Sequence, residues 1–557
     1  MLTFIHTYAP DVFPALLKSS LWRGGDGLKL MHKPDFAPPF DFNTAAAPGG
    51  ALDTLLNELR CPFYIDRLQG GLGYPKNYPY DETLLDRLKM TLGENFWGFQ
   101  MHEWASNLCS DEKRIAELFD REGKDPRDPE ERNRVWDRVV SAELPLYLEA
   151  YPAEDWRNMP LSDGPESFTK AAEALYARRA KETGGLLFPA DSYLMAPRTE
   201  LAFGAKRLMP EVGWQIPNMR AQLALTRGAA RSAGVPWGIY YECWQDTKDF
   251  GFTIPFSLGE VQDEWNEDLF RRANGAELPL SRRELGGSSL SLLRRAWRLA
   301  YFSGAEYIAE EYGVCNTFRS LITAELSPYG EEKRDFLRFA EKFPDPGVPF
   351  VPVAVVLPAD VPMFDVTFGD CYPGYMFSYL PESAAANAER AFRETMAAVF
   401  GTAGKNGNMG HVIKNGGLPG AVDIVYEDSP ALSRYDMLID PTGDPTFAQR
   451  HPNAVTVEEA DRRLDGLLPC RFGGGLFAAY NRTTDGWLVL VMNNDGVFHD
   501  GFMPDVKLPE AAVTAFIEQA APGAQVTMAA GDGILSESGG KYAVTLGAGE
   551  WLLLSIR

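Results

Sequence analysis

Trp237-Gly-Ile-Tyr-Tyr-Glu242 is an apolar run that ends in a carboxylate, and it follows the amphipathic segment 219–233. The same order of short apolar run, polar loop and amphipathic helix recurs before and after this segment in the chain. The other runs of this kind are 61–66, 95–101, 186–190, 207–211 and 305–311. Apolar strands that alternate with helices predict a parallel sheet covered by helices on its faces.

This alternation continues to about residue 345 and predicts a (β/α)8 barrel with insertions. The apolar runs locate six or seven of the eight strands that such a barrel needs. Helices are expected over 81–92, 111–122, 129–151, 166–183, 219–233 and 291–302. The fold class expected for the first part of the chain is therefore α/β.

The pattern restarts after Phe343-Pro-Asp-Pro-Gly-Val-Pro349. Strands over 350–358, 422–426 and 435–440, with a helix over 389–400, predict a small open α/β domain. From Gly474 onward, short alternating runs between glycine-rich turns predict an antiparallel β-sandwich. We therefore expect three domains: the barrel over 1–345, a small α/β domain over 346–470 and the sandwich over 471–557.

Composition restricts the partners. The 557 residues carry 54 Lys+Arg against 77 Asp+Glu, a net charge of −23, which disfavours nucleic acid and anionic membranes as partners. No window reaches the roughly 18 apolar residues of a membrane span, and the first ten residues do not resemble an export signal. The six cysteines show no CxxC spacing and indicate reduced thiols. A soluble cytoplasmic protein is expected.

Carboxylates follow nearly every predicted strand, beside aromatic or amide side chains. Active sites of parallel barrels lie at the carboxyl ends of their strands, so these side chains are expected to meet there. Two carboxylates are what hydrolysis of a glycosidic bond requires, one as the acid and one as the nucleophile or base. The acidic candidates are Glu103, Glu211, Glu242 and Glu311.

Glu211 and Glu242 form the first candidate pair because their separation equals about one strand–helix–strand unit. Glu211 lies near Trp214, and burial against an apolar ring favours the protonated form that a general acid needs. Glu242 takes the role of nucleophile or base, although the two roles are interchangeable at this point. Glu311 is the third catalytic candidate, and either it or Glu103 can replace a member of the pair.

Aromatic rings and polar side chains near these carboxylates suit contacts with sugar rings and hydroxyl groups. The candidates for substrate binding are Asp66, Arg67, Glu103, Trp104, Trp214, Asn218, Tyr241 and Trp244. Each also has a purely structural interpretation, as a helix cap, an ion pair or a core aromatic. His102 precedes Glu103, but the six histidines are scattered along the chain, so neither a metal nor a cofactor is expected.

The order of domains resembles that of the three-domain β-galactosidases, within the clan of (β/α)8-barrel retaining glycoside hydrolases. The strand Val353-Ala-Val-Val-Leu-Pro358 resembles the opening strand of their second domain, and 422–426 and 435–440 resemble its later strands. The resemblance implies a retaining mechanism with two glutamates and a homo-oligomer. This sequence has Met209-Pro210-Glu211 where those enzymes carry an Asn-Glu pair.

The sequence thus predicts a glycoside hydrolase that acts on an oligosaccharide or glycoconjugate. One alternative is a non-catalytic carbohydrate-binding barrel that has lost its acid pair. Another is a barrel lyase or isomerase that uses carboxylates with a divalent metal.

Overall fold

The computed structural model describes residues 2–8, 12–30, 41–65, 81–143, 148, 150–151, 153–213, 219–242, 290–311, 317–363, 382–401, 413–498, 506–519 and 523–557. Within these ranges, no helix combines the length and the apolar character that crossing a bilayer requires.

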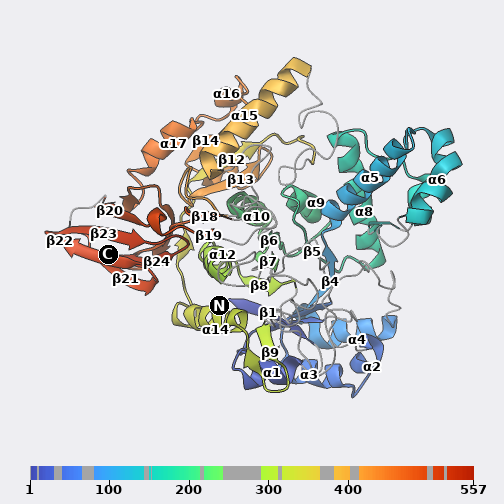
Figure 1. Cartoon of the computed structure of the whole chain (residues 1–557), viewed down its shortest axis with the longest axis horizontal. Coiled ribbons are helices and arrows are strands. Elements are labelled where there is room, and N and C mark those ends of the chain that lie inside the picture. The colour runs from blue at the N-terminus through green and yellow to red at the C-terminus, as the bar shows by residue number, and fades with distance from the viewer. Residues whose placement is uncertain are drawn as a thin grey trace. The chain divides into compact units, whose positions relative to one another are not determined.

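Eight strands form one parallel sheet, in the order β5-β4-β3-β2-β1-β8-β7-β6. Figure 1 labels β1, β4, β5, β6, β7 and β8 among them. Asp191, directly after β5, and Pro210, directly before β6, form a parallel bridge. This bridge joins the two ends of the strand order, so the sheet closes into the predicted barrel. The strands are β1 (Thr3–Tyr8), β2 (Gly27–Leu30), β3 (Phe63–Ile65), β4 (Phe96–His102), β5 (Leu187–Ala190), β6 (Glu211–Gly213), β7 (Gly238–Glu242) and β8 (Tyr307–Glu310).

β1 and β2 are the two barrel strands that the apolar pattern did not locate. β1 pairs in parallel with both β2 and β8. Its His6 and Thr7 are buried polar residues, and β2 buries Lys29 in a strand of only four residues. Polar side chains inside such short strands interrupt the apolar run that identified the other six.

β6 begins at Glu211, so the strand predicted over 207–211 is wrong in its bounds. Pro210 has no N–H group and cannot donate to a strand ladder, which confines it to the isolated bridge with Asp191. Glu211 is therefore the first residue of its strand, whereas the prediction made it the last.

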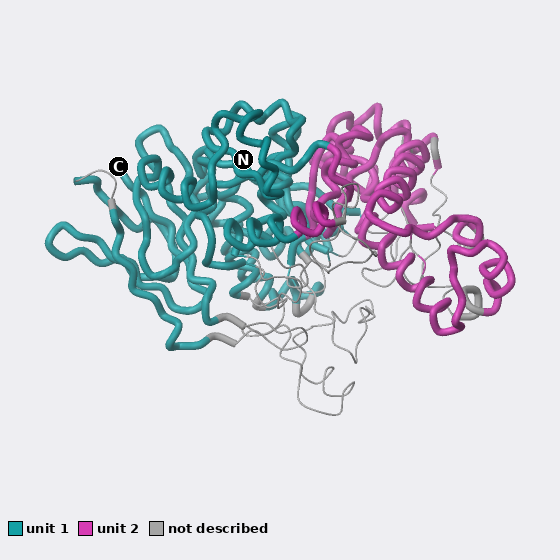
Figure 2. The backbone as a smooth tube through the Cα atoms, turned by 90° about the horizontal axis from the view of Figure 1, so that it is seen from above, with its two compact units in different colours: residues 1–40, 212–359, 390–557 teal, residues 41–211, 360–389 magenta. Residues whose placement is uncertain are grey.

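The chain divides into two compact units (Figure 2). Unit 1 comprises Met1–Phe40, Val212–Ala359 and Arg390–Arg557, and unit 2 comprises Asp41–Glu211 and Asp360–Glu389. The domain boundaries at residues 345 and 470 stay a prediction.

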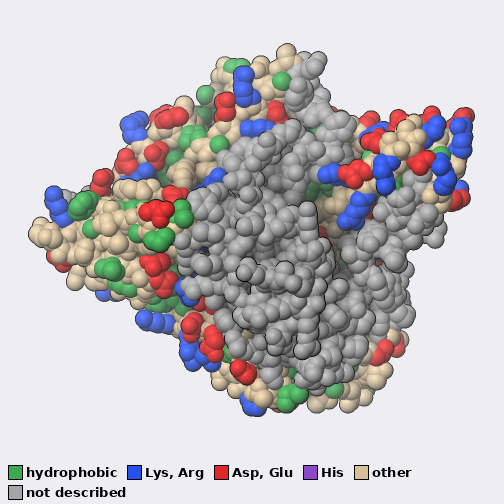
Figure 3. Space-filling model, in the orientation of Figure 1, with side chains coloured by type: hydrophobic (Ala, Val, Ile, Leu, Met, Phe, Trp, Pro, Cys, Tyr) green, Lys and Arg blue, Asp and Glu red, His purple; other side chains and the backbone are tan. Residues whose placement is uncertain are grey.

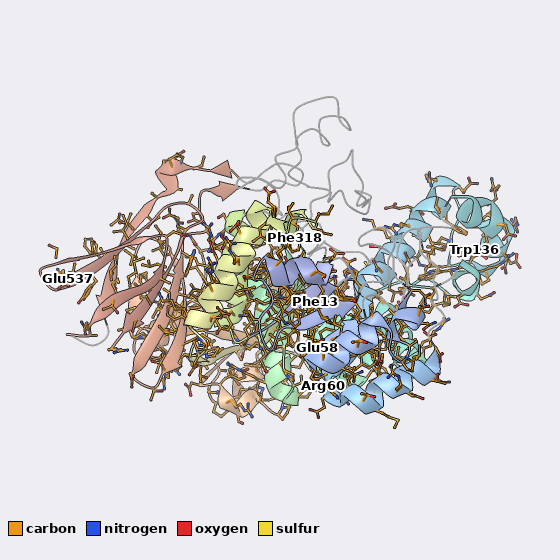
Figure 4. The ribbon with its side chains drawn as sticks, turned by 90° about the horizontal axis from the view of Figure 1, so that it is seen from below. Phe13, Glu58, Arg60, Trp136, Phe318 and Glu537 are labelled. Carbon is orange, nitrogen blue, oxygen red and sulfur yellow. The ribbon has the colours of Figure 1, made fainter. Side chains whose placement is uncertain are left out.

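Unit 2 contains β3, β4 and β5 and a set of helices around them. The side chain of Asp81 caps α4 by accepting from the Thr83 N–H, and Gly184 and Gly185, with φ of 61° and 80°, follow the end of α8. Trp136 of α6 is 1% exposed and packs near Phe119 of α5 (Figure 4). The helices are α2 (Phe42–Ala46), α3 (Ala51–Leu59), α4 (Glu82–Leu92), α5 (Trp104–Arg121), α6 (Pro129–Glu143), α7 (Ala153–Asn158), α8 (Pro165–Glu182) and α9 (Ala196–Ala202).

Unit 1 contains β1, β2, β7 and β8 with the helices α1 (Val12–Lys18), α10 (Met219–Ala233), α12 (Leu290–Phe302) and α14 (Pro328–Lys342). α10 is buried over most of its length because it also packs on the small parallel sheet. That sheet has the order β13-β12-β14 and is formed by β12 (Val353–Leu357), β13 (Val422–Tyr426) and β14 (Met437–Ile439). This sheet matches the expected open α/β fold. The helices α15 (Glu382–Phe400) and α17 (Val457–Leu464) come from the same part of the chain.

In the described C-terminal part, β18 (Val497–Phe498) and β19 (Val506–Lys507) form a small antiparallel pair. Two larger antiparallel sheets match the pattern expected there. Their strand orders are β11-β16-β17-β24-β21 and β15-β20-β23-β22. β22 (Ile534–Ser538) is an edge strand that exposes Glu537 (Figure 4), and charged side chains on an edge hinder pairing with another chain. The other bounds are β11 (Val348–Pro349), β15 (Cys470–Phe472), β16 (Phe477–Thr483), β17 (Gly486–Met492), β20 (Val513–Gln519), β21 (Val526–Gly531), β23 (Lys541–Leu546) and β24 (Trp551–Ile556).

Acidic and basic side chains alternate over the described part of the face shown in Figure 3. Neither sign of charge forms a single continuous patch on the described part of this face.

Candidate active site

Five of the candidate residues lie outside the described residues: Asp66, Arg67, Trp214, Asn218 and Trp244. Of the others, Glu103, Trp104 and Glu211 belong to unit 2, whereas Tyr241, Glu242 and Glu311 belong to unit 1. Glu242 is the last residue of β7.

Glu211 lies level with the carboxyl ends of β4 and β5. His102, the last residue of β4, pairs with Ala190, the last residue of β5. One residue further on, the Asp191 carbonyl accepts from the Glu211 N–H at 2.9 Å. Although Glu211 begins its own strand, it therefore lies at the edge of the sheet where parallel barrels carry their active groups.

The structure brings Glu211 together with His102. Glu211 is 1% exposed and His102 is 9% exposed. A ring nitrogen of His102 and a carboxylate oxygen of Glu211 lie within 4.8 Å of each other. These two side chains are also of the kind that bind metal ions.

Glu103 adopts a left-handed backbone conformation, with φ 45° and ψ 40°. Its N–H donates to the Ala190 carbonyl at 2.6 Å, and its own carbonyl accepts from the Asn107 N–H at 2.7 Å. Its carboxylate lies 3.2 Å from His102 Nε2, and the Glu103 side chain is 33% exposed. A strained, non-glycine residue at the mouth of a barrel is a common feature of functional sites.

Asp191 caps the first turn of α5 from the neighbouring strand. Its carboxylate accepts from the Ala105 N–H at 2.6 Å, the Ser106 hydroxyl at 2.9 Å and the Tyr193 N–H at 2.7 Å. Burial raises the pKa of Asp191 to about 7, although these three donors act in the opposite direction. Asp191 thus fixes the chain that immediately follows His102 and Glu103.

Trp104 is 1% exposed, and its ring packs edge-on against Tyr176 at a centroid distance of 5.0 Å. Its Nε1 donates to Glu200 Oε1 at 3.0 Å. Burial raises the pKa of Glu200 to about 8. These contacts favour a packing and orienting role for Trp104, and its contact with substrate stays a prediction.

In unit 1, Glu311 follows the last residue of β8 and is 3% exposed. Its N–H donates to the Tyr241 carbonyl of β7 at 2.9 Å. Its own carbonyl accepts from Lys29 Nζ at 2.5 Å. Both backbone polar groups of Glu311 are therefore bound at the carboxyl end of β8.

Neighbouring tyrosines of β7 point to opposite faces of the strand. Tyr241 is fully buried and lies against Trp297 of α12, with ring centroids 5.9 Å apart. The Tyr240 hydroxyl, in contrast, accepts from Lys29 Nζ at 3.0 Å. This placement favours a packing role for Tyr241, so its contact with substrate stays a prediction.

Sequence patterns alone do not single out Lys29, Tyr240 or Glu200. A lysine between two leucines, as in Gly27-Leu-Lys-Leu30, resembles a surface position, and Glu200 lies within the short helix α9. The one sequence signal that Lys29 belongs to a strand is its place in a short apolar segment after the glycine-rich turn 24–27. His102 precedes Glu103 in the sequence, but the other five histidines lie far from it along the chain and indicate no partner for a metal site.

No family model matches this chain, and no curated protein matches it. Among solved structures it is similar to the catalytic module of a family 98 glycoside hydrolase from Streptococcus pneumoniae, with 9% identity, coverage of 99% of this chain and 98% of that one, and a TM-score of 0.41. An α-L-fucosidase from Paenibacillus thiaminolyticus has 10% identity, full coverage of both chains and a TM-score of 0.43. A β-galactosidase from the haloarchaeon Halorubrum lacusprofundi has 11% identity, coverage of 100% and 99%, and a TM-score of 0.34. At these identities and TM-scores the similarities assign no activity to this chain.

Proposed function

We propose that this protein is a retaining glycoside hydrolase in which Glu211 and Glu311 are the catalytic pair. One observation supports the proposal: both glutamates are buried, at most 3% exposed, at the carboxyl ends of barrel strands. Glu211 lies level with the ends of β4 and β5, and Glu311 lies level with the ends of β7 and β8. This is where such barrels carry their reactive groups. The substrate class is an oligosaccharide or a glycoconjugate.

Glu211 takes the role of general acid. Burial penalises the charged form of a carboxyl group, and a neutral carboxyl is what protonates a leaving oxygen. A ring nitrogen of His102 lies within 4.8 Å of a Glu211 carboxylate oxygen, a separation that one bridging water could span for proton transfer.

Glu311 takes the role of nucleophile. The Tyr241 carbonyl binds the Glu311 N–H and Lys29 binds the Glu311 carbonyl, so the backbone that carries this carboxylate is fixed at the end of β8. Glu242, at the end of β7 between β6 and β8 in the strand order, is the alternative nucleophile.

In the proposed reaction the Glu311 carboxylate attacks the anomeric carbon while Glu211 donates its proton to the departing oxygen. Water then attacks the glycosyl-enzyme, and Glu211 takes a proton from that water. The released sugar keeps its anomeric configuration, and both carboxyl groups return to their starting states.

The experiment that tests this proposal compares Glu211→Gln, Glu311→Gln and Glu242→Gln on a panel of aryl glycosides with leaving groups of different acidity. Glu211→Gln is expected to lose most of its kcat/KM on glycosides of weakly acidic phenols and to keep kcat/KM on a 2,4-dinitrophenyl glycoside, whose leaving group needs no proton. Its kcat on the dinitrophenyl glycoside is expected to fall, because the variant lacks the base for the second step. Glu311→Gln is expected to lose activity on all of them. If Glu242→Gln is the variant inactive on every glycoside, Glu242 is the nucleophile, and if all three variants are fully active the proposal fails.

The proximity of His102 and Glu211 favours a second candidate, a metal-assisted lyase or isomerase reaction. Turnover that disappears after treatment with a strong chelator and returns with a divalent cation would support it. Glycoside hydrolysis that survives the chelator contradicts it, and sugar binding without any turnover supports the non-catalytic barrel instead.

A further inference from the structure

A buried lysine binds the end of β8 from the inside of the barrel. Lys29 Nζ lies 2.7 Å from the Glu310 carbonyl oxygen and 2.5 Å from that of Glu311, and it donates to the Tyr240 hydroxyl at 3.0 Å. An ammonium group has three N–H donors, and these three acceptors match them. Lys29 is fully buried, so its charge is bound by the protein instead of by water.

A second lysine binds the same strand end from the other face. Lys333 of α14 forms an ion pair with the Glu310 carboxylate and donates to Thr317 Oγ1 at 2.7 Å. Lys333 is 3% exposed and Glu310 is 2% exposed. Because α14 lies in the helix layer, Lys333 acts on the outer face of β8, whereas Lys29 acts on the inner face, where the carbonyl groups of Glu310 and Glu311 accept from it.

We propose that Lys29 is a positioning residue for Glu311. By fixing two consecutive carbonyl groups, it holds the backbone from which the Glu311 side chain extends, and so holds that carboxylate in the geometry of attack. Its engaged N–H groups make it a bound cation and not a nucleophile. This inference rests on the proposed function of Glu311, and it extends that function to a residue that does not touch the substrate.

The test uses Lys29→Ala, which removes three methylene groups and the ammonium, together with n-propylammonium, which replaces those atoms. On 4-nitrophenyl glycosides, kcat is expected to fall about 100-fold, the effect of a misplaced reacting group, while KM stays within about threefold. Propylammonium is expected to restore much of kcat, and n-propanol, which fills the same space without charge, is not.

Lys333→Met is the matched control, because it removes the outer contact and is expected to lower stability without a comparable loss of kcat. Tyr240→Phe removes only one acceptor, leaves the fold intact and is expected to lower kcat by a smaller factor. Lys29 is not a positioning residue if folded Lys29→Ala and Tyr240→Phe keep the kcat of the wild type, or if propanol rescues as well as propylammonium.

A wild-type protein that hydrolyses no glycoside contradicts the proposed function and not this contact. In that case amide hydrogen exchange of the peptide that carries Glu311 tests whether Lys29 fixes the backbone there. Exchange is expected to rise in Lys29→Ala and to fall again with propylammonium. Unchanged exchange overturns the inference.

Discussion

The Asp191 carboxylate accepts a hydrogen bond from the Ala105 N–H at 2.6 Å and thereby joins the end of β5 to the first turn of α5. The first N–H groups of a helix have no partner within the helix, so an acceptor at this place stabilises it. Ala105 lies two residues beyond Glu103, and Asp191 also offers its carbonyl to Glu211. The geometry of both acidic residues in unit 2 thus depends on Asp191.

Asp191→Ala is expected to lower the free energy of unfolding by about 1–2 kcal/mol, the cost of a lost cap, and to lower kcat as well. Urea unfolding and turnover of an aryl glycoside measure the two effects. Asp81→Ala removes the exposed cap of α4 and is the control, because it is expected to cost stability alone. Equal kcat in the two variants would show that Asp191 contributes to stability but not to turnover.

Glu103→Gly is expected to stabilise the fold and to reduce activity. A non-glycine residue in the left-handed region costs roughly 1–2 kcal/mol, which glycine avoids. Arg60, which ends α3 with φ 50°, offers a matched control (Figure 4). Arg60→Gly relieves the same strain outside the candidate site and should leave turnover unchanged. A Glu103→Gly variant with full activity would show that turnover needs neither the carboxylate nor the strained backbone at this position.

Stability should fall as the pH rises from 5 to 8, and Glu200→Gln should reduce that fall. Burial raises the pKa of Glu200 from 4.5 to about 8 in the folded state, so the folded protein binds more protons than the unfolded chain over this interval. Each pKa unit corresponds to roughly 1.4 kcal/mol, lost as the pH rises. The amide of the Glu200→Gln variant keeps an acceptor for Trp104 Nε1 and does not titrate. Urea unfolding at several pH values measures the slopes, and parallel slopes for the wild type and the variant would contradict the raised pKa.

Gly228→Ala is expected to destabilise unit 1, although alanine favours helices. A Cβ atom at this position of α10 would lie 2.2 Å from the Ile424 carbonyl oxygen of β13, which is backbone and cannot rotate away. A net loss of about 1–3 kcal/mol is expected from such overpacking. At Gly24, in contrast, an added Cβ meets no atom within 4 Å, so Gly24→Ala should be neutral. Thermal unfolding compares the two, and equal melting temperatures would contradict the close approach of α10 and β13.

The strands that sequence reasoning found contain an unbroken apolar run, as β12 does over its whole length and β7 does before Glu242, because such a run identifies a strand buried on both faces. β2 was not found because its central residue is Lys29, and a charge in a short run indicates a surface position until its buried partners are known. The same side chain is the one that binds the end of β8. The buried lysine that interrupts the apolar pattern of β2 is therefore also the residue that contacts the candidate site.

Sequence also placed acidic residues at the carboxyl ends of the strands without placing them relative to one another. The nearness of His102 and Glu211 depends on the bridge that closes the barrel between β5 and β6, a contact between residues that are far apart in the chain. Spacing alone favoured Glu242 as the partner of Glu211. Glu311, whose backbone contacts Lys29 and Tyr241, stays a proposal as that partner.

Trapping of the glycosyl-enzyme tests the central claim most directly. An activated 2-deoxy-2-fluoro glycoside of the accepted sugar slows the hydrolysis of the intermediate, because the fluorine destabilises the oxocarbenium-like transition state. Mass spectrometry of the digested protein should then find one fluoro-sugar on the peptide that carries Glu311, and none in Glu311→Gln. Covalent label on a different residue, or an active enzyme that acquires no label, would contradict the account.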